Sequence, residues 1–449
     1  MKYLVYGSNL ICILAALRIK TLKPKSEVII ADQASSLGGN MRSVNFMDHF
    51  YDIGMQTYFD TGIKWVDNLV REALVKSKIE CSYHQWPFHD NVGLVYDGNL
   101  KINSPYIDAK YFKDLLKIKK QIKKNVFKNY KPLDEKLDDF FYRRFGISKN
   151  NKIIKSILTK YSHAEYGLQA YHFSSTMPFD RIIFDKISLN ELNIIPRLKN
   201  YIAYPNREIT SLYEKKNKFT IYPCSGGIKE LILAFDKLLK LKKIKYFPNI
   251  KAQYLKNNNS IQFINYQKKK LKFDKLIWGT SLEYFSKIYK NDMINYLNNT
   301  EIKHLNGSLV HIFTEKPINS KGLQYVFNYD ISPINRITFY GEMTKKEIDY
   351  RRASIEFIGE VKKPFQTIKN FFKTHKFYEK GNFACSDQLK IPWPLYFPIG
   401  IGRKHKFFSK KLREVNAVIA VLSSDVSKGS ILFSPTASRV LKNFSEKIK

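Results

Sequence analysis

The order of apolar segments in the first 32 residues constrains the fold of this chain most strongly. Their spacing predicts a buried strand at Lys2–Tyr6, a helix at Leu10–Leu22 and a second strand at Glu27–Ala31, followed directly by Asp32. Two parallel strands joined by a helix bring the helix N-terminus and the acid to the same edge of a sheet. Such an edge binds a dinucleotide, with its pyrophosphate at the helix N-terminus and a ribose hydroxyl on the acid. We therefore expect an α/β protein with a dinucleotide-binding unit at its start.

The turn before the first helix departs from the usual glycine pattern of such units. In G-x-G-x-x-G the glycines make the turn, admit the phosphates and allow the helix to pack closely on the strand. The corresponding residues here are Gly7, Asn9 and Cys12. Asn tolerates a left-handed backbone and Cys is small, so we expect the turn to persist with an altered cradle formed by Gly7, Ser8 and Asn9, next to Asp32. Taken alone, the turn also suits an ordinary packing unit.

A second glycine-rich segment follows the acid. It reads SSLGGNMRS from Ser35 to Ser43 and FMDHFYDIGMQTYF from Phe46 to Phe59. In this order the segment resembles amine oxidases, protoporphyrinogen oxidases and UDP-galactopyranose mutases, in which an acid is followed by LGGRxRS and then by FDxGxHxF. Several matches in register favour this resemblance over a glycine turn followed by an unrelated hairpin.

The resemblance implies that the chain binds FAD. Family members bring the backbone amides of the glycine pair to the cofactor, and an arginine reaches towards it. The residues implied in this segment are Gly38, Gly39, Arg42, Gly54 and Gln56. The chain has Asn40 where the family often has Arg, and Gln56 where it often has His. We therefore expect unusual surroundings for the flavin.

Later segments continue the resemblance. YPCSGGIKELILAFDKLL, at Tyr222–Leu239, is similar to the family's YPxGGxxxLxxAL start of a helix. Apolar spacing then predicts strands within Ile244–Leu255, at Ser260–Tyr266 and within Lys272–Gly279. The resemblance implies that the residue matching Ala252 contacts adenine through its main chain.

The C-terminal segment predicts a return to the first domain. Asn416–Leu422 has the pattern of a buried strand and Ser434–Ile448 that of a helix. The resemblance implies that Asp425 and Ser430, in the turn between them, lie near the cofactor. Ser424 stands where the family has a glycine.

These motifs divide the chain into two discontinuous domains. We expect a GR2-type flavoprotein, in which a Rossmann-like FAD-binding domain carries a discontinuous α+β substrate domain. The FAD-binding domain comprises residues 1–57, 207–300 and 399–449. The substrate domain comprises residues 58–206 and 301–398, as a helical insertion and a mixed sheet.

No catalytic residue can be assigned from the sequence. Four residues at the ends of predicted elements or in aromatic-rich loops are expected to contact substrate: Tyr58, Arg336, Tyr340 and Arg403. No G-x-S-x-G, HExxH or Walker A motif occurs, and the 9 histidines form no pattern for a metal. We therefore predict flavin chemistry without a metal.

The composition limits the classes of partner that are expected for this chain. The chain has 76 Lys and Arg against 40 Asp and Glu, a formal charge of +36. The lysines are spread along the chain, which predicts a solvated surface and no specific nucleic-acid partner. The apolar run Val415–Leu422 is too short to span a bilayer, although peripheral membrane contact stays open. The 4 cysteines form no CxxC pair, which fits a reduced cytoplasmic setting.

Three functions remain open from the sequence. The first is an FAD-dependent oxidoreductase acting on an amine or another small organic molecule. The second is a mutase-like enzyme of surface-polysaccharide synthesis, in which reduced flavin attacks the anomeric carbon of a nucleotide sugar. The third is a non-catalytic relative whose altered Gly7-Ser8-Asn9 turn no longer holds FAD.

Overall fold

The structure is a computed structural model of the whole chain. It describes residues 1–53, 57–86, 92–102, 218–265, 267–289, 303–304, 307–330, 332–358, 361–391, 395–396, 401–423 and 433–448.

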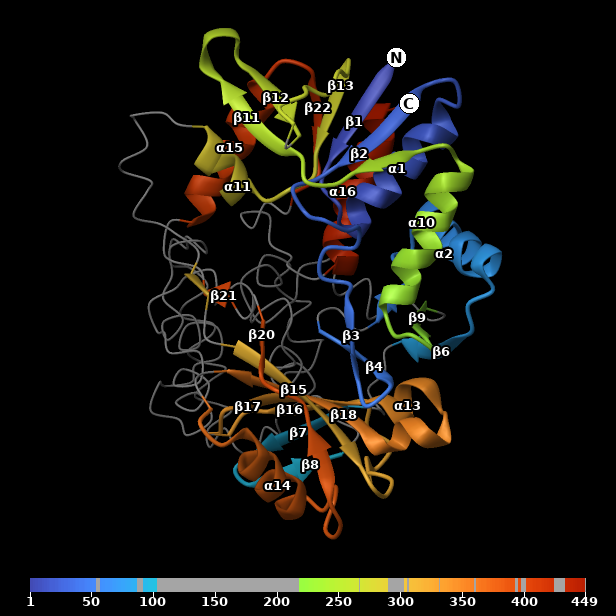
Figure 1. The fold of residues 1–449 in the computed structure, drawn as a ribbon, viewed down its shortest axis with the longest axis vertical. Helices are drawn as coiled ribbons and strands as arrows, with labels where there is room; N and C mark the ends of the chain where they lie inside the picture. The colour runs from blue at the N-terminus through green and yellow to red at the C-terminus, as the bar shows by residue number, and fades with distance from the viewer. Residues whose placement is uncertain are drawn as a thin grey trace, which may run out of the picture.

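Five parallel strands from three distant parts of the sequence form the first sheet (Figure 1). In spatial order they are β10 (Lys245–Phe247), β2 (Glu27–Ala31), β1 (Lys2–Tyr6), β13 (Lys275–Trp278) and β22 (Val418–Val421). Every neighbouring pair is parallel. The chain moves outward from β1 in one direction through β2 and β10, and in the other through β13 and β22. The order therefore reverses between β1 and β13, the place where open α/β sheets bind ligands at their carboxyl edge.

Both faces of this sheet are covered. On one face lie α1 (Leu10–Leu22), α10 (Lys229–Leu241) and α16 (Phe433–Ile448), with α2 (Lys64–Ser77) against α10 (Figure 1). On the other lie the hairpin of β11 (Lys251–Leu255) and β12 (Ser260–Ile264), joined by the short helix η5 (Lys256–Asn258), and the helices α11 (Leu282–Ile288) and α15 (Ile401–Glu414). This is the mixed α/β architecture that the sequence predicted.

The start of α1 explains how the altered glycine turn survives. Asn9 caps the helix, because its Oδ1 accepts a hydrogen bond from the Cys12 amide at 3.1 Å. Cys12, at the third glycine position, is fully buried. Its sulfur lies against Gly7 and Gly279, where any Cβ would collide with it. Gly279, which follows β13, thus provides the free space that a glycine on the helix would otherwise provide.

A second sheet of eight strands lies below the first in Figure 1. Its members are β7 (Val92–Tyr96), β8 (Asn99–Lys101), β15 (Gly307–Thr314), β16 (Tyr325–Asn328), β17 (Ile334–Phe339), β18 (Arg352–Ile358), β19 (Phe383–Cys385) and β20 (Leu389–Ile391). Alternate residues of β15, β17 and β18 form an apolar core beneath α14 (Pro364–Thr374). The strand β17 ends at Phe339, because Tyr340 begins the helix α13 (Tyr340–Thr344).

Short elements connect the two sheets. The hairpin of β3 (Ser43–Phe46) and β4 (His49–Asp52) runs between them (Figure 1). Its two turn residues, Met47 and Asp48, both have positive φ, as a type I′ turn requires. The remaining elements are β5 (Tyr58–Phe59), β9 (Lys218–Pro223) and β6 (Cys81–Trp86) in a three-stranded sheet, β14 (Lys303–His304) paired with β21 (Leu395–Tyr396), and the 3-10 helix η7 (Glu347–Arg351).

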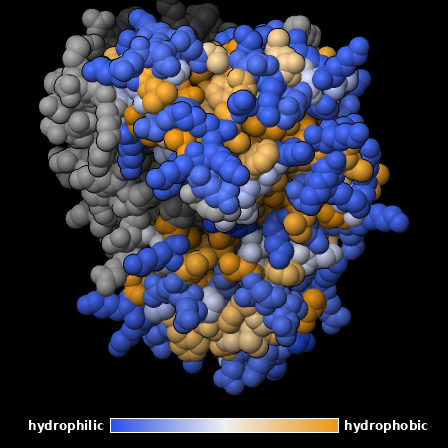
Figure 2. All heavy atoms as spheres, turned by 45° about the horizontal axis from the view of Figure 1, so that its top comes forward, coloured by the Kyte–Doolittle hydropathy of each residue, from blue (hydrophilic) through white to orange (hydrophobic). Residues whose placement is uncertain are grey.

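Hydrophilic side chains cover most of the face shown in Figure 2, and hydrophobic ones lie among them in small groups. Within the described ranges, no helix has the length and apolar character needed to cross a membrane.

The packing of Cys12 on Gly279 can be tested by a paired substitution. In Gly279→Ala the new methyl overlaps Cys12 Sγ, so we expect the free energy of unfolding to fall by roughly 1–3 kcal/mol, the usual cost of overpacking. Cys12→Ala in the same chain should restore most of that loss. Urea unfolding of both single variants and the double variant measures the coupling, and simple additivity would contradict this account.

Candidate functional site

Two glycine segments meet at the carboxyl edge of the first sheet. The Gly7 amide donates to Ala31 O at 2.8 Å, and the Gly38 amide donates to Ser8 O at 2.7 Å. Gly7, Gly38 and Gly39 all have positive φ, with Gly39 in the left-handed region at 59°. A Cβ on Gly39 would lie 3.2 Å from the Cβ of Asn9. The second segment therefore lies directly on the turn that begins α1, at the point where the strand order reverses.

Asn9 holds this turn from both sides. Besides capping α1, it donates from Nδ2 to the main-chain oxygen of Gly279 at 3.0 Å. Glycine at this position could make neither bond. The replacement thus ties the turn to the segment that follows β13.

The meeting point presents hydrogen-bond donors. Among the described residues, the amides of Leu10, Ile11, Gly39 and Asn40 have no acceptor. The first two belong to the N-terminus of α1, where backbone donors and the helix dipole favour an anion. Arg42 folds back and donates from Nε to Gly39 O at 2.7 Å, which places its positive charge next to the same loop.

Asp32 ends β2 at the same edge. It is 8% exposed, and its Oδ1 accepts from the Ala34 amide at 3.2 Å. Two buried hydroxyls also end neighbouring strands: Thr280 Oγ1 after β13 and Ser423 Oγ after β22 have no partner within the described part of the chain. Unpaired donors and acceptors at one sheet edge fit the pyrophosphate and sugar hydroxyls of a dinucleotide.

The implied adenine contact is arranged differently. Ala252 is buried on β11, and its N–H donates to the hydroxyl of Tyr284 at 3.2 Å. Gly54, Gln56, Asp425 and Ser430 lie outside the described residues.

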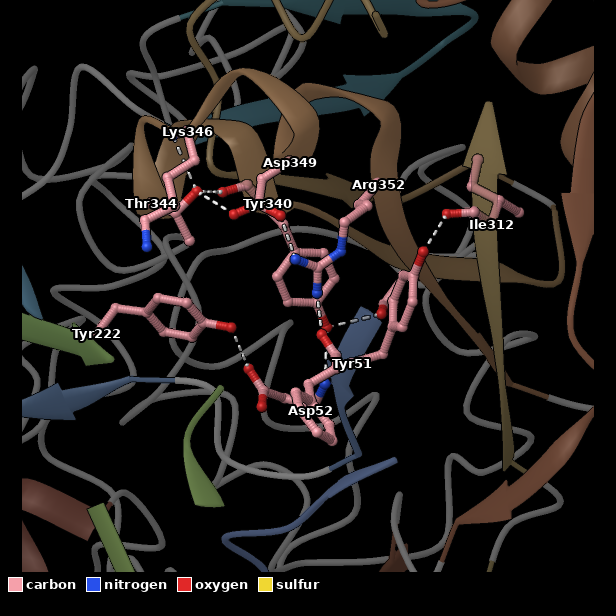
Figure 3. A network of polar contacts seen from close by, with 11 residues as sticks. Tyr51, Asp52, Tyr222, Ile312, Tyr340, Thr344, Lys346, Asp349 and Arg352 are labelled. Atoms are coloured by element: carbon pink, nitrogen blue, oxygen red, sulfur yellow. Dashed lines mark hydrogen bonds and ion pairs between the residues drawn. The ribbon is translucent and has the colours of Figure 1, made fainter. Parts of the chain in front are cut away.

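A buried carboxylate joins the β3–β4 hairpin, β9 and α10 to the residue that follows β17 of the second sheet (Figure 3). Asp52, fully buried at the end of β4, accepts hydrogen bonds from Ser43 Oγ at 2.7 Å and Tyr222 Oη at 2.8 Å. It also accepts from the amide of Ile228, the N-cap residue of α10, at 2.9 Å. Its own amide donates to Tyr340 Oη at 2.8 Å. Burial raises the pKa of Asp52 to about 6, although these hydrogen bonds oppose the rise.

Arg352 supplies the positive charge of this network. It is 5% exposed, is paired with Asp349 and donates to Phe50 O. Its guanidinium lies 4.7 Å from the ring centroids of both Tyr51 and Tyr340, within cation–π range. Figure 3 shows Arg352 between these two rings.

His311 completes the network from β15. Its Nδ1 lies 2.8 Å from Ser354 Oγ, and burial together with the Arg352 charge lowers its pKa to about 3. The imidazole is therefore neutral at physiological pH and serves as a polar packing group.

The four residues expected to contact substrate are dispersed. Tyr58 is fully buried and donates to Asp67 Oδ1 at 2.9 Å, which is a structural position. Tyr340 is fully buried in the Asp52 network, again a structural position. Arg403 lies exposed on α15, away from the second sheet.

Of these four residues, only Arg336 lies on a strand of the second sheet, where it faces the polar side chain of Glu356. Its Nη2 is 2.9 Å from Glu356 Oε2, directly across from it on β18. Asn335 Nδ2 donates to the other Glu356 oxygen at 2.7 Å. Because Glu356 is 7% exposed and neutralised by Arg336, the pair forms a partly buried polar patch that can orient a polar substrate group.

Sequence reasoning did not find the Asp52 network. Asp52 is the acid of the FDxGxHxF-like segment, so the sequence did mark this residue. Its hydrogen-bond partners Tyr222, Ile228 and Tyr340 are distant in the sequence, and no pattern marked them. Arg352 had no sequence signal, because nothing in its neighbours marks it as buried.

Comparison with known proteins identifies the fold. No family model matches the chain, and no curated protein matches its sequence. Solved structures do match. A protein from Exiguobacterium assigned as a protoporphyrinogen oxidase has a TM-score of 0.62 at 12% identity, covering 100% of this chain and 98% of its own. A reduced UDP-galactopyranose mutase has a TM-score of 0.63 at 13% identity, covering 100% and 94%.

Putrescine oxidase bound to putrescine has a TM-score of 0.61 at 11% identity, covering 100% of this chain and 99% of its own. This chain has the amine oxidase-like fold. The resemblance read from the glycine segments is thereby confirmed at the level of the fold. Because both oxidases and a mutase share the amine oxidase-like fold, the fold leaves the reaction open.

The raised pKa of Asp52 predicts a pH-dependent stability. The folded protein favours the protonated carboxyl, so this group's contribution to the free energy of unfolding falls as pH rises from about 4 to about 6. Asp52→Asn removes that titration. The stability difference, variant minus wild type, should therefore increase by roughly 2–3 kcal/mol between about pH 4 and pH 7. Urea unfolding at several pH values measures the difference, and parallel profiles would contradict the assignment.

Proposed function

We propose that this chain is an FAD-binding enzyme that carries out flavin-dependent redox chemistry on a small organic substrate. The observation that supports this proposal best is that the segment containing Gly7 and the segment containing Gly39 meet at the N-terminus of α1. Unpaired amides, Arg42 and Asp32 gather there, at the switch point of a sheet with the amine oxidase-like fold. These residues fit the pyrophosphate and the neighbouring ribose.

Each residue has a distinct binding task. The amides of Leu10, Ile11 and Gly39 donate hydrogen bonds to the pyrophosphate oxygens. Asp32 accepts a hydrogen bond from a ribose hydroxyl, and the Ala34 amide, which donates to its Oδ1, fixes the carboxylate. Asn9 keeps the turn closed on Gly279, so the amides are oriented before the cofactor arrives.

The flavin supplies electron transfer to and from carbon, which no side chain provides. The protein orients the substrate beside it. The polar patch of Arg336 and Glu356 belongs to the second sheet, which the Asp52 network holds against the cofactor domain. We propose that this patch binds the polar end of the substrate.

A second candidate is a mutase-like reaction on a nucleotide sugar, without net oxidation. The observations that favour it are the similarity to UDP-galactopyranose mutase and the charge of +36, which suits a diphosphate. The two are distinguished by substrate: a small amine reduces the oxidised flavin anaerobically, whereas a UDP-sugar is isomerised only by enzyme with reduced flavin. A protein that takes up no flavin would contradict both.

The cofactor site can be tested at Gly39. In Gly39→Ala, a methyl at a left-handed position meets Asn9 and crowds the cradle, so we expect FAD affinity to fall at least about tenfold. Gly98→Ala is the matched control, because Gly98 has φ of 73° but open space around its Cβ. It carries the same backbone strain away from the site. Equilibrium titration of flavin fluorescence measures both, and equal affinities would contradict the placement.

A further inference from the structure

The two edge strands of the first sheet differ in how they are protected. β10 ends the sheet on one side, and it carries Lys245 and is followed directly by Pro248. Lysine and proline are residue types that keep an edge strand from pairing with another chain. β22 ends the sheet on the other side, and its sequence, VIAV, contains neither a charge nor a proline. Among the described residues only β13 pairs with β22, so the other edge of β22 is free for main-chain pairing.

Val421 turns its main-chain groups towards this free edge. The Leu422 amide donates to the main-chain oxygen of Trp278 at 2.7 Å, so the main chain of residue 422 faces β13. Successive residues of a strand direct their N–H and C=O groups to opposite sides. The N–H and C=O groups of Val421 therefore point away from β13, where no described strand meets them.

A cavity of about 350 Å³ lies along the same part of β22, between α15 and α16. The two helices pack on opposite faces of the sheet, so the cavity follows its edge. Val421 and Leu422 line it from the strand, and Val440 and Phe444 of α16 add apolar surface. The volume is within the range of about 300–1,000 Å³ that is usual for ligand sites.

Both helices bring positive charge to this cavity. Arg413 of α15 and Lys447 of α16 line it, and both side chains are exposed. Glu414, the acid next to Arg413, is already paired with Lys411 at 2.8 Å. Glu446 also lines the cavity, but consecutive residues of a helix do not face each other, so it is poorly placed to pair with Lys447. The cavity therefore favours a negatively charged occupant.

The main-chain groups of Val421 determine what kind of anion fits. A small inorganic anion can accept from the Val421 amide, but its charge is repelled by the carbonyl oxygen on the same edge. An extended peptide satisfies both groups, because a residue of an added strand can donate to one and accept from the other. Acidic side chains of such a peptide can reach Arg413 and Lys447.

A second copy of this chain fits the edge less well. Pairing β22 with β22 around a two-fold axis brings the same groups of both copies together. The sequence VIAV offers no acid to the cavity, and Arg413 and Lys447 of one copy would meet the same cations of the other. Charge complementarity thus favours a different partner.

We propose that the free edge of β22, between α15 and α16, binds an extended acidic segment of a partner protein, which adds a strand to the first sheet. This interaction surface is separate from the proposed flavin chemistry and does not depend on it. The Val421 main chain pairs with the backbone of the segment, and Arg413 and Lys447 bind its acidic side chains.

The test uses the full-length protein and a fluorescein-labelled peptide of about eight alternating glutamate and valine residues, an ordinary strand length. Fluorescence anisotropy should show saturable binding, and a peptide with lysine in place of glutamate should not bind. In Arg413→Gln/Lys447→Gln we expect the affinity to fall about three- to thirtyfold, the range of two exposed ion pairs. Lys410→Gln/Lys442→Gln is the matched control, because it removes the same charge from exposed positions of the same helices outside the cavity.

Modified peptides test the main-chain pairing. Methylation of the glutamate amides and methylation of the valine amides remove donors from opposite edges of the peptide, so one modification should abolish binding and the other should spare it. Equal affinity for both modified peptides, or equal losses in the two double variants, would overturn the proposal. No saturable binding by the wild type would overturn it too. So would a dimer in sedimentation velocity that is lost in Val421→Pro, since proline removes the outward amide and is tolerated on an edge strand.

Discussion

A single buried carboxylate determines how the two sheets of this protein meet. Asp52 accepts hydrogen bonds from Ser43 on its own hairpin, from Tyr222 near the end of β9 and from the start of α10. Its amide donates to Tyr340, which directly follows β17 of the second sheet. A fully buried carboxyl is tolerated only when its oxygens are hydrogen-bonded, so these segments must arrive together. Arg352, held between Tyr51 and Tyr340, adds a compensating charge at the same junction. This contact therefore helps to set the position of the polar patch of Arg336 and Glu356 relative to the first sheet.

The sequence predicts local structure far better than it predicts this junction. The strands Lys2–Tyr6 and Glu27–Ala31 and the helix Leu10–Leu22 occur with the expected bounds, because their apolar runs and cap are set by neighbouring residues. The Asp52 partners are 170 or more positions away in three cases, and no local pattern marks a tyrosine as the donor to a distant carboxylate. Long-range polar pairing depends on the assembled fold, which the local pattern of a single sequence does not specify.

The glycine turn shows a second limit of sequence reading. Judged position by position, Asn9 and Cys12 weaken the dinucleotide motif. In the structure each is accommodated by Gly279, which offers its carbonyl to Asn9 and lacks a side chain where the Cys12 sulfur packs. What the motif requires is free space and suitable hydrogen bonds at one contact, between α1 and the end of β13. A glycine in a distant segment can satisfy that requirement, so the departure from the pattern does not imply loss of the cofactor.

The two ends of the proposed cofactor site differ in how they are prepared. At the phosphate end the donors are left unpaired by the backbone, and a helix N-terminus and Arg42 attract charge before any ligand is bound. At the adenine end the amide of Ala252 is already satisfied by Tyr284. Exchanging one neutral hydrogen bond for another has a net effect of only about 1 kcal/mol, so this pairing is little obstacle to a ligand that takes the same amide. The bond keeps a partly buried amide paired, and that constraint makes a tyrosine more suitable there than an apolar residue of the same size.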